Sequence, residues 1–399
     1  MSGSSDIDAA ALIRQRAWVE VDLGAIACNV QTLRRHLRPA TDLMAVVKAD
    51  AYGHGAIAVA RTVLAAGATC LCVATLLEAI ELRQAGIGAP ILLLGATHSA
   101  DQARAAAQWR IEPTLSSPEQ AAVFSQVLAE QGRELPVHLK LDTGMARLGA
   151  PWAEAVEFFR AVRGLPGLRV SSLYSHLATA DELDQTVLRQ QQQRFEQAIA
   201  ALHQAGLPCP TLHLANSAAA IAFPELQFDA VRVGLALYGV YPAPHLRRRL
   251  ELQPALQVKA RVTHIRDLPA GTGVSYGHRF ITPQPIRMAV IGIGYADGIL
   301  RSLSNRMQVL ARGRRLPQIG TITMDQLMVD ATTLPDLAPG DVVTLLGEEG
   351  TERISADDWA LQAGTIPWEV LCGFRQRLPR WSGGQQPRPM LDQPSQGLV

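Results

Sequence analysis

Between about residue 22 and residue 241 the chain repeats one pattern, in which a short apolar run is followed by an amphipathic segment. The runs have the length of buried strands, and several intervening segments end at a glycine, which commonly follows the last turn of a helix. The eight runs cover residues 43–47, 70–75, 91–94, 111–115, 137–141, 170–174, 211–214 and 230–235. Eight strands alternating with helices over about 220 residues predict an α/β fold, a closed (β/α)8 TIM barrel, with a doubly wound open sheet as the alternative.

The rhythm changes after Pro254. Segments such as IRMAVIGIG, TMDQLMVDAT and DVVTLLG read as short strands separated by Gly and Pro turns. We therefore expect a flexible N-terminus over residues 1–17, the barrel over 18–254, a β-rich domain over 255–382 and a disordered tail over 383–399. The first strand, at 18–23, precedes the barrel units and is free to pair with the β-rich domain instead.

Charge and cysteine usage narrow the functional class. The net charge is +1, so neither nucleic acid nor a membrane surface is an expected partner. The five cysteines show no paired CxxC spacing, which fits a reducing compartment. The N-terminus has no apolar export signal, and no uncharged run reaches the roughly 18 to 20 residues of a spanning helix. The sequence predicts a soluble cytoplasmic protein.

Polar residues gather where the expected barrel strands end, and the active site of such a barrel lies at the C-terminal ends of its strands. They are Lys48 and Tyr52 after the first strand, Lys140 and Arg147 after the fifth, His176 after the sixth, Asn216 and Ser217 after the seventh, and Arg232 and Gly234 at the eighth. We expect these groups to meet in one mouth.

The residue types at that mouth favour one chemistry. A buried lysine at the end of a strand, Lys48, is costly unless its amine is paired or chemically used. No acidic residues stand at the matching strand ends beside His138, His176 and His213, so we expect no metal site and interpret these histidines as structural hydrogen-bonding residues. Ser217 at a helix start and Gly234 suit a phosphate. A phosphate site and a strand-end lysine together suggest pyridoxal 5'-phosphate held as a Schiff base.

Several motifs together resemble those of a known family. The strings AVVKADAYGHG, KLDTGMARLG, SHLATADE, HLANSAA, VRVGLALYG, SYG, GYADG and TMDQ occur in the order found in alanine racemases, from about Trp18 to Arg380. The resemblance implies a fold-type III pyridoxal phosphate enzyme, a barrel plus a β-domain. It further implies interconversion of L- and D-alanine for peptidoglycan synthesis, by a homodimer whose active sites are shared between subunits.

The resemblance also implies the catalytic roles. Lys48 would carry the cofactor and act as acid or base on one face of the substrate Cα, and Tyr276 of the other subunit would act on the opposite face, with His176 near it. Arg232 would face the pyridine nitrogen. Because arginine keeps its proton, that nitrogen would stay unprotonated, which weakens the cofactor as an electron sink and limits transamination and decarboxylation.

Further roles follow from the same resemblance. Arg147 would bind the substrate carboxylate, and Lys140 would be carbamylated and orient Arg147. Met324 and Asp325 would contact substrate from the second subunit. The remaining matches are the cofactor contacts Tyr52, Asn216, Ser217 and Gly234, and the access-corridor residues Tyr295, Arg301 and Asp181. Trp368 departs from the family, which usually has a phosphate-contacting tyrosine there; an indole N–H donates one hydrogen bond but accepts none.

Other functions remain as alternatives. One alternative is a racemase of broader specificity, which also accepts serine or other amino acids. A decarboxylase of the same architecture would place a carboxylate against the pyridine nitrogen, and Arg232 speaks against it. A non-catalytic pyridoxal phosphate carrier would not need Tyr276 and the second domain. A metal hydrolase would need acidic ligands, which are missing at the matching strand ends.

Overall fold

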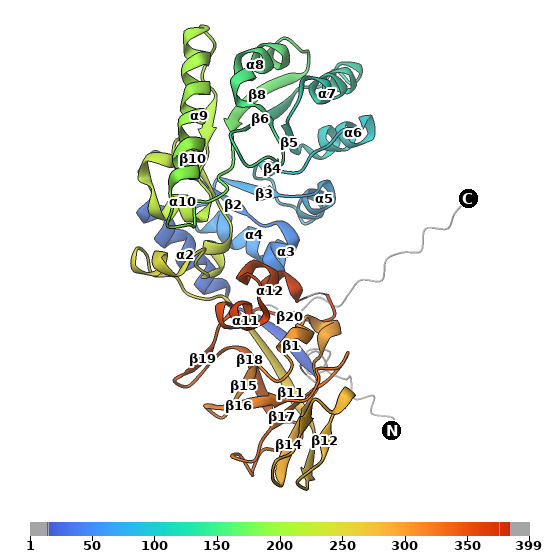
Figure 1. The fold of residues 1–399 in the computed structure, drawn as a ribbon. Coiled ribbons are helices and arrows are strands. Elements are labelled where there is room, and N and C mark those ends of the chain that lie inside the picture. Colours follow the sequence, from blue (N-terminus) through green and yellow to red (C-terminus); the bar gives the residue numbers. More distant parts are fainter. Residues whose placement is uncertain (1–13, 15, 375, 384–399) are drawn as a thin grey trace, which may run out of the picture. The chain divides into compact units, whose positions relative to one another are not determined.

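The computed structural model describes residue 14, residues 16–374 and residues 376–383 (Figure 1). The expected flexible N-terminus and disordered tail fall almost wholly outside these residues. Two compact units make up the described chain. One extends from Leu23 to Pro254, and the other combines the described residues up to Asp22 with those from Ala255 onward.

Eight parallel strands form a closed barrel in the unit Leu23–Pro254. They are β2 (Asp42–Val46), β3 (Cys70–Val73), β4 (Ile91–Leu93), β5 (Glu112–Leu115), β6 (Leu135–Asp142), β8 (Leu168–Tyr174), β9 (Thr211–His213) and β10 (Ala230–Val233). The order is β5-β4-β3-β2-β10-β9-β8-β6, and β6 closes the ring by pairing with β5 through His138 and Thr114. Each strand overlaps one predicted run, so the closed barrel is confirmed and the open sheet is wrong.

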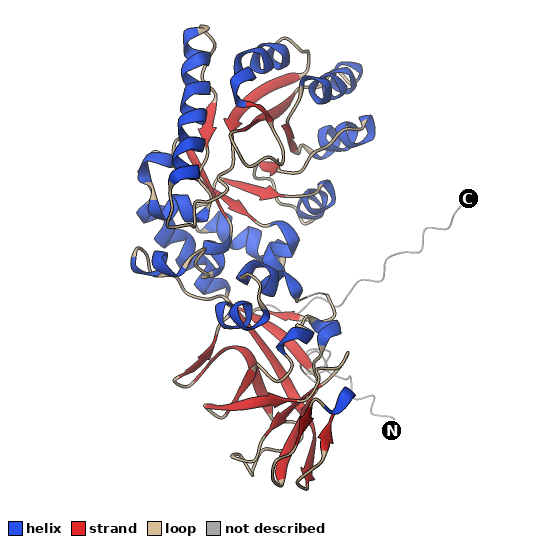
Figure 2. Ribbon diagram, viewed as in Figure 1, coloured by secondary structure: helices blue, strands red, loops and turns tan. Residues whose placement is uncertain are grey.

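Helices lie outside the barrel strands (Figure 2). They are α2 (Leu23–His36), α3 (Lys48–Gly53), α4 (Ala56–Ala65), α5 (Leu76–Gln84), α6 (Ala100–Trp109), α7 (Pro118–Glu130), α8 (Ala155–Arg163), α9 (Thr186–Gln204) and α10 (Ser217–Ala222). Local sequence sets several helix starts: Thr75 and Ser99 begin α5 and α6 with reciprocal capping boxes, which satisfy otherwise unpaired backbone N–H groups. The short additions are β7 (Ala150–Pro151) and the 3-10 turns η1 (Trp152–Glu154), η2 (Pro224–Leu226), η3 (Leu235–Tyr238) and η4 (Pro244–Arg248).

The second unit is built on a nine-stranded sheet of order β19-β18-β15-β16-β17-β14-β11-β1-β20. Its strands are β1 (Ala17–Val21), β11 (Leu256–Leu268), β14 (Ile286–Ile291), β15 (Gln308–Ala311), β16 (Arg314–Ile319), β17 (Leu327–Asp330), β18 (Val342–Glu349), β19 (Glu352–Ile354) and β20 (Arg380–Trp381). β1 pairs antiparallel with β11, from Ala17 opposite Ala260 to Val21 opposite Leu256. The domain boundaries expected from the sequence placed this first strand, at 18–23, with the barrel. In the structure β1 lies in the sheet of the β-rich unit.

Turns and short helices complete this unit. They are β12 (Gly273–Val274), β13 (Phe280–Ile281), η5 (Tyr276–His278), η6 (Tyr295–Asp297), η7 (Arg301–Leu303), α11 (Ala356–Ala363) and α12 (Pro367–Gly373). Side chains alternate between the two faces of β14, β16 and β17. On one face Met288, Ile319 and Met328 are buried in one apolar cluster, against which Phe280 packs. The η5 turn is carried on the β12–β13 hairpin, whose Val274 belongs to that cluster.

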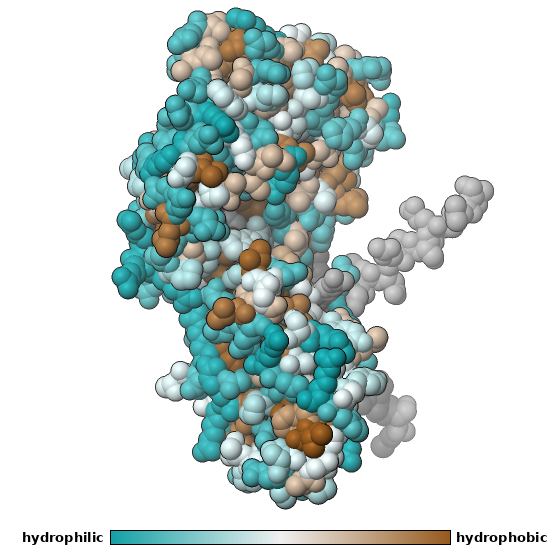
Figure 3. Space-filling model, viewed as in Figure 1, coloured by the Kyte–Doolittle hydropathy of each residue, from teal (hydrophilic) through white to brown (hydrophobic). Residues whose placement is uncertain are grey.

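The surface is ordinary for a globular protein. Figure 3 shows a mostly hydrophilic face on which apolar residues are scattered rather than gathered in one broad patch. Single exposed apolar side chains such as Leu77 and Leu361 need no special explanation. None of the helices formed by the described residues is long and apolar enough to cross a membrane.

Candidate active site

Lys48 follows β2 at the C-terminal end of the barrel and begins an unusual turn. The four residues Ala49–Tyr52 all have φ between 52° and 54°, a left-handed conformation that costs L-residues roughly 1–2 kcal/mol each. Hydrogen bonds hold the turn: the Ala49 N–H donates to Glu78 Oε1 over 2.7 Å, and Asp50 Oδ1 accepts from the Ala56 N–H over 2.7 Å. Local strain maintained by surrounding contacts is typical of functional sites.

Three predicted phosphate contacts come together beside this turn. The Gly234 N–H donates to Ser217 Oγ over 2.9 Å, and a Cβ at Gly234 would lie 2.7 Å from Tyr52 Oη. The Tyr52 ring packs against Tyr238 with 5.0 Å between centroids. Asn216 accepts from the Ala219 N–H over 3.1 Å and so caps α10. Only glycine at position 234 keeps the backbone open beside the Tyr52 hydroxyl.

Arg232, on β10, is 3% exposed and held by both ends of its guanidinium. Nη1 donates to His213 Nδ1 over 2.6 Å, and Nη2 donates to the carbonyls of Ser175 and Leu214 over 2.7 and 3.1 Å. Nη2 also lies 3.2 Å from His176 Nδ1. The Nε–H forms no hydrogen bond with any described residue, so one fixed donor of a buried arginine remains for a ligand.

Positive charge accumulates at the same mouth. Burial and then the charges of Arg232 and Arg147 lower the pKa of Lys140 to about 8, with Lys48 adding to the effect and Asp142 opposing it. Burial and the same cations also lower the pKa of His176 well below its ordinary value, so its imidazole is neutral. Arg147 is exposed, and its side chain forms no hydrogen bond or ion pair with another described residue. Such a mouth is suited to anions.

These residues fit pyridoxal phosphate. The cofactor needs an amine for its aldehyde, a cradle for its phosphate and a polar partner for its ring nitrogen. Lys48 provides the amine, and the group formed by Tyr52, Ser217 and Gly234 is a cradle that a Cβ would fill. Arg232 has the unpartnered Nε–H.

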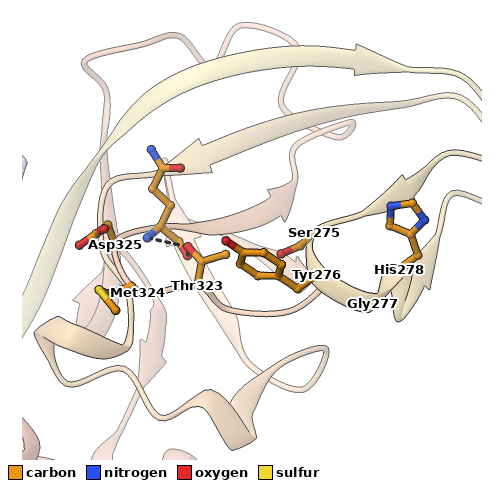
Figure 4. Close-up of a pocket in the computed structure, with 8 residues that line it drawn as sticks. Ser275, Tyr276, Gly277, His278, Thr323, Met324 and Asp325 are labelled. Atoms are coloured by element: carbon orange, nitrogen blue, oxygen red, sulfur yellow. Dashed lines mark hydrogen bonds between the residues drawn. The ribbon is translucent and has the colours of Figure 1, made fainter.

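A second group of predicted residues meets in the β-rich unit. Tyr276, Met324 and Asp325 line one pocket of about 730 Å³, and the Tyr276 phenol points toward Thr323 (Figure 4). The pocket is open, because Tyr276 is 72% exposed and Met324 is 53% exposed. Thr321 Oγ1 donates to the Tyr276 carbonyl over 2.8 Å and anchors the backbone beneath the exposed ring.

Tyr295 belongs to the loop beside this pocket. Its N–H donates to the Thr323 carbonyl over 3.0 Å. Asp297, two residues after Tyr295, is fully buried, and its Oδ1 accepts a hydrogen bond from Arg16 Nη2 over 2.6 Å. Arg377 contacts both Asp297 and Asp325, which ties the pocket's carboxylate to the buried ion pair.

No hydrogen bond or ion pair among the described residues links three further predicted residues to either group. Asp181 is half-buried between β8 and α9, and Arg301 is exposed on η7. Neither side chain forms a hydrogen bond or ion pair with another described residue. Trp368 is half-buried on α12, in the β-rich unit.

Sequence reasoning missed several residues that shape the barrel site. Tyr174 lies beneath two of its cations, with Lys140 Nζ 5.6 Å and the Arg232 guanidinium carbon 4.8 Å from its ring centroid, and His213 stacks on it at 4.6 Å. His213 was expected to be a structural hydrogen-bonding residue, and it is the acceptor for Arg232 Nη1; the sequence did not name that partner. A polar residue within an apolar strand was the available signal.

Family comparisons cover both units. Residues 21–242 match the family model described as "Alanine racemase, N-terminal domain", and residues 255–382 match "Alanine racemase, C-terminal domain". An alanine racemase of Nostoc sp. is 58% identical over 382 residues, which is 95% of this chain and 99% of the relative. One from Synechocystis sp. is 58% identical over 369 residues, 92% of this chain and 99% of the relative.

Solved structures similar to this chain belong to the same family. Alanine racemase from Bacillus anthracis with bound L-Ala-P matches with a TM-score of 0.87 and 38% identity, covering 92% of this chain and 95% of that one. Alanine racemase from Bartonella henselae with covalently bound pyridoxal phosphate matches with a TM-score of 0.82 and 32% identity, covering 92% and 99%. Matches of this length and identity leave no doubt about kinship, and the chain belongs to the alanine racemase family.

Proposed function

We propose that the chain interconverts L- and D-alanine with pyridoxal phosphate, as a cytoplasmic homodimer that supplies D-alanine for peptidoglycan. The observation that carries the proposal is Arg232, a buried arginine with a free Nε–H at the strand end assigned to the ring nitrogen. A donor that keeps its proton disfavours ring protonation and therefore favours racemisation over decarboxylation. The five cysteines, all free in the structure, support a reducing compartment.

Pyridoxal phosphate, when bound, supplies an electron-withdrawing system that acidifies the substrate Cα–H. The chain's own residues do the rest. Lys48 would bind the cofactor through its amine, and Tyr52, Ser217 and Gly234 would hold the phosphate, with Asn216 capping the start of α10 beside them. Trp368 would take the place of the family's phosphate-contacting tyrosine.

Racemisation needs proton donors and acceptors on opposite faces of one carbon. Lys48 Nζ would take or return the proton on one face, and Tyr276 Oη on the other. A phenolate oxygen is stabilised beside cations and hydrogen-bond donors, so we expect such groups to face Tyr276 Oη. The cationic mouth described above would supply such cations, and neutral His176, whose Nδ1 accepts from Arg232 Nη2, would carry its proton on Nε2 and donate a hydrogen bond to the phenolate.

The substrate carboxylate would bind Arg147. Lys140 supports this role, because a pKa of about 8 leaves a usable fraction of neutral amine for attack on carbon dioxide. The resulting carbamate would be an anion beside Arg147, whose guanidinium has no partner among the described residues. Met324 and Asp325 would contact substrate opposite the barrel, with Tyr295, Arg301 and Asp181 along the approach.

The exposure of Tyr276 and Met324 supports a site shared between two subunits. Tyr276 and Met324 present 72% and 53% of their surfaces to solvent, which is a poor setting for proton transfer at carbon. A second subunit's barrel would cover them. Coexpression of Lys48→Ala and Tyr276→Phe chains tests this: random pairing leaves one intact site in half of the dimers, so activity should return to about a quarter of wild type. Recovery at the background of either variant would refute the shared site.

Activity is tested directly on the cofactor-loaded enzyme with L-alanine, L-serine and L-lysine in turn. Loss of optical rotation with L-alanine is the expected result, and carbon dioxide release would instead indicate a decarboxylase. The chain has three lysines, Lys48, Lys140 and Lys259. Borohydride should attach the cofactor to Lys48 alone, and attachment to either of the others would overturn the assignment.

A further inference from the structure

A line of hydrogen bonds crosses the barrel interior from Arg232 to Glu112. Arg232 Nη1 lies 2.6 Å from His213 Nδ1, and His213 Nε2 lies 2.8 Å from Ser172 Oγ. Ser172 Oγ lies 2.6 Å from His138 Nδ1, and His138 Nε2 lies 2.8 Å from Glu112 Oε2. The five residues come from β10, β9, β8, β6 and β5. We call Ser172, His138 and Glu112 the distal relay.

The direction of these bonds is set from the arginine end. A guanidinium only donates, so His213 Nδ1 must accept and the ring must carry its proton on Nε2. Burial, and then the charge of Arg232, lowers the pKa of His213 well below its ordinary value, which keeps the ring neutral. Its Nε2–H therefore donates to Ser172 Oγ.

The same logic continues to the carboxylate. The Ser172 hydroxyl must donate to His138 Nδ1, because the two imidazoles are its hydrogen-bond partners and His213 already donates to it. His138 then carries its proton on Nε2 and donates to Glu112. If His138 also donated to Ser172, the hydroxyl proton would have no acceptor among the described residues at a site 2% exposed.

All four bonds thus point from the cation to the carboxylate. Hydrogen bonds aligned in one direction polarise one another, so negative charge at Glu112 strengthens His213 Nδ1 as an acceptor. Water cannot substitute easily, because His213 is 0% and His138 is 4% exposed. Glu112 begins β5, at the end of the barrel opposite the mouth, and its side chain is 17% exposed.

We propose that the distal relay is a set of positioning residues for the racemase reaction: through His213 it fixes the Arg232 guanidinium so that Arg232 keeps the cofactor's pyridine nitrogen unprotonated. The proposal rests on the proposed function, since it assigns a reaction-controlling role to groups that touch neither substrate nor cofactor. Loosening the relay should let the nitrogen gain a proton and strengthen the electron sink.

Two variants interrupt the relay with little change in volume. Ser172→Ala removes the central hydroxyl, and Glu112→Gln removes the charge at the partly exposed end while keeping an acceptor. Ser125→Ala is the matched control, because Ser125 is 4% exposed and its hydroxyl donates to the Pro166 carbonyl over 2.8 Å, away from the barrel interior.

The first readout is nitrogen NMR of the cofactor-free protein with labelled histidine. The His213 Nδ1 signal, assigned by its loss in His213→Gln, should show an unprotonated, hydrogen-bonded nitrogen in wild type. It should move toward a free imidazole in Ser172→Ala, move less in Glu112→Gln, and stay unchanged in Ser125→Ala. An unmoved signal in both relay variants overturns the proposal.

The second readout is the side reaction of the loaded enzyme with L-alanine. Transfer of the amino group to the cofactor leaves pyridoxamine phosphate and releases pyruvate. Pyruvate per racemisation turnover should rise about fivefold to tenfold in Ser172→Ala and about twofold in Glu112→Gln, as expected for loss or weakening of a buried hydrogen bond. A ratio equal to that of Ser125→Ala would make the relay structural only. Failure of the wild type to racemise alanine would instead refute the proposed function and leave the NMR result standing.

Discussion

The two groups of candidate site residues differ in how much of their setting each unit supplies. In the barrel, Arg232 is 3% exposed and Lys140 is 5% exposed, and their neighbours come from several strands of one closed sheet. In the β-rich unit, Tyr276 and Met324 are 72% and 53% exposed on turns. The barrel group is buried and held by its own unit, whereas the other group offers side chains to solvent.

This difference has a physical origin. A closed barrel surrounds its strand ends with low-dielectric protein, so charges there interact strongly and shift each other's pKa, as Lys140 shows. Exposed groups on turns keep ordinary solvation until something covers them. The barrel group is therefore organised within its own unit, whereas the chemistry proposed for Tyr276 would need a second subunit to cover it.

Among the substitutions that test this difference between the two groups, Tyr276→Phe should have the largest effect on activity. It removes one acid–base group and should lower racemisation about 10²- to 10⁴-fold, with thermal stability unchanged because the side chain is exposed. We assign the α-proton of L-alanine to Tyr276 and that of D-alanine to Lys48. Lys48 remains in the variant, so D-alanine should still exchange its α-proton with deuterated water, whereas exchange from L-alanine should be lost. Equal loss of exchange from both enantiomers would contradict the division of labour.

Gly234→Ala probes the phosphate cradle. The new Cβ would lie 2.7 Å from Tyr52 Oη, whose ring is packed against Tyr238, so the cradle must distort. We expect about tenfold weaker pyridoxal phosphate binding, equivalent to about 1.4 kcal/mol, measured by absorbance titration. Gly88→Ala is the matched control, since nothing lies within 4 Å of its Cβ. Equal affinity in the two variants would rule out the cradle at Gly234.

Lys140 gives a pH test of the cationic mouth. Its pKa is lowered to about 8, so the neutral amine that reacts with carbon dioxide is about a tenth of the population at pH 7 and about nine tenths at pH 9. With labelled bicarbonate, a carbamate signal in carbon NMR should therefore grow as pH rises through 8. Lys140→Ala should abolish that signal and lower racemisation about tenfold. A signal that persists in this variant would place the carbamate elsewhere.

Trp368→Tyr should have the smallest effect. The substitution restores the phenol that the family usually has and exchanges the single N–H donor of the indole for the O–H donor of a smaller ring, which should tighten pyridoxal phosphate binding by only about twofold to threefold. The same absorbance titration measures it. Weaker binding in the variant would mean that the indole is better adapted to this chain's pocket than the phenol.

The fold was largely readable from the sequence. All eight apolar runs correspond to barrel strands, because strands buried on both faces must be continuously apolar and the helices between them must be amphipathic. Ends differed by one or two residues at most strands; β6 begins at Leu135 where the run began at 137. β1 was ambiguous because a single strand has no periodicity that names its partner, and only its register against β11 decides it.

The sequence predicted the site residues that directly follow a barrel strand or end one. Lys48, Lys140, Arg147, His176 and Arg232 form one electrostatic cluster, as expected from their strand ends. The left-handed turn at Ala49–Tyr52 was not foreseeable, since no glycine occupies those four positions and distant groups such as Glu78 hold it. Asp181 and Arg301 remain predictions without a structural tie to the rest.

By itself the sequence determined the barrel, the β-rich unit and the residue types at the strand ends, because these depend on local periodicity and on the order of the strands. Only the tertiary structure decided that Ser172 and Glu112 stand in line with His138 and His213 behind Arg232. Hydrogen bonds between strands depend on side-chain direction and stagger around a closed barrel, to within a fraction of an ångström. No pattern along a single strand carries that information.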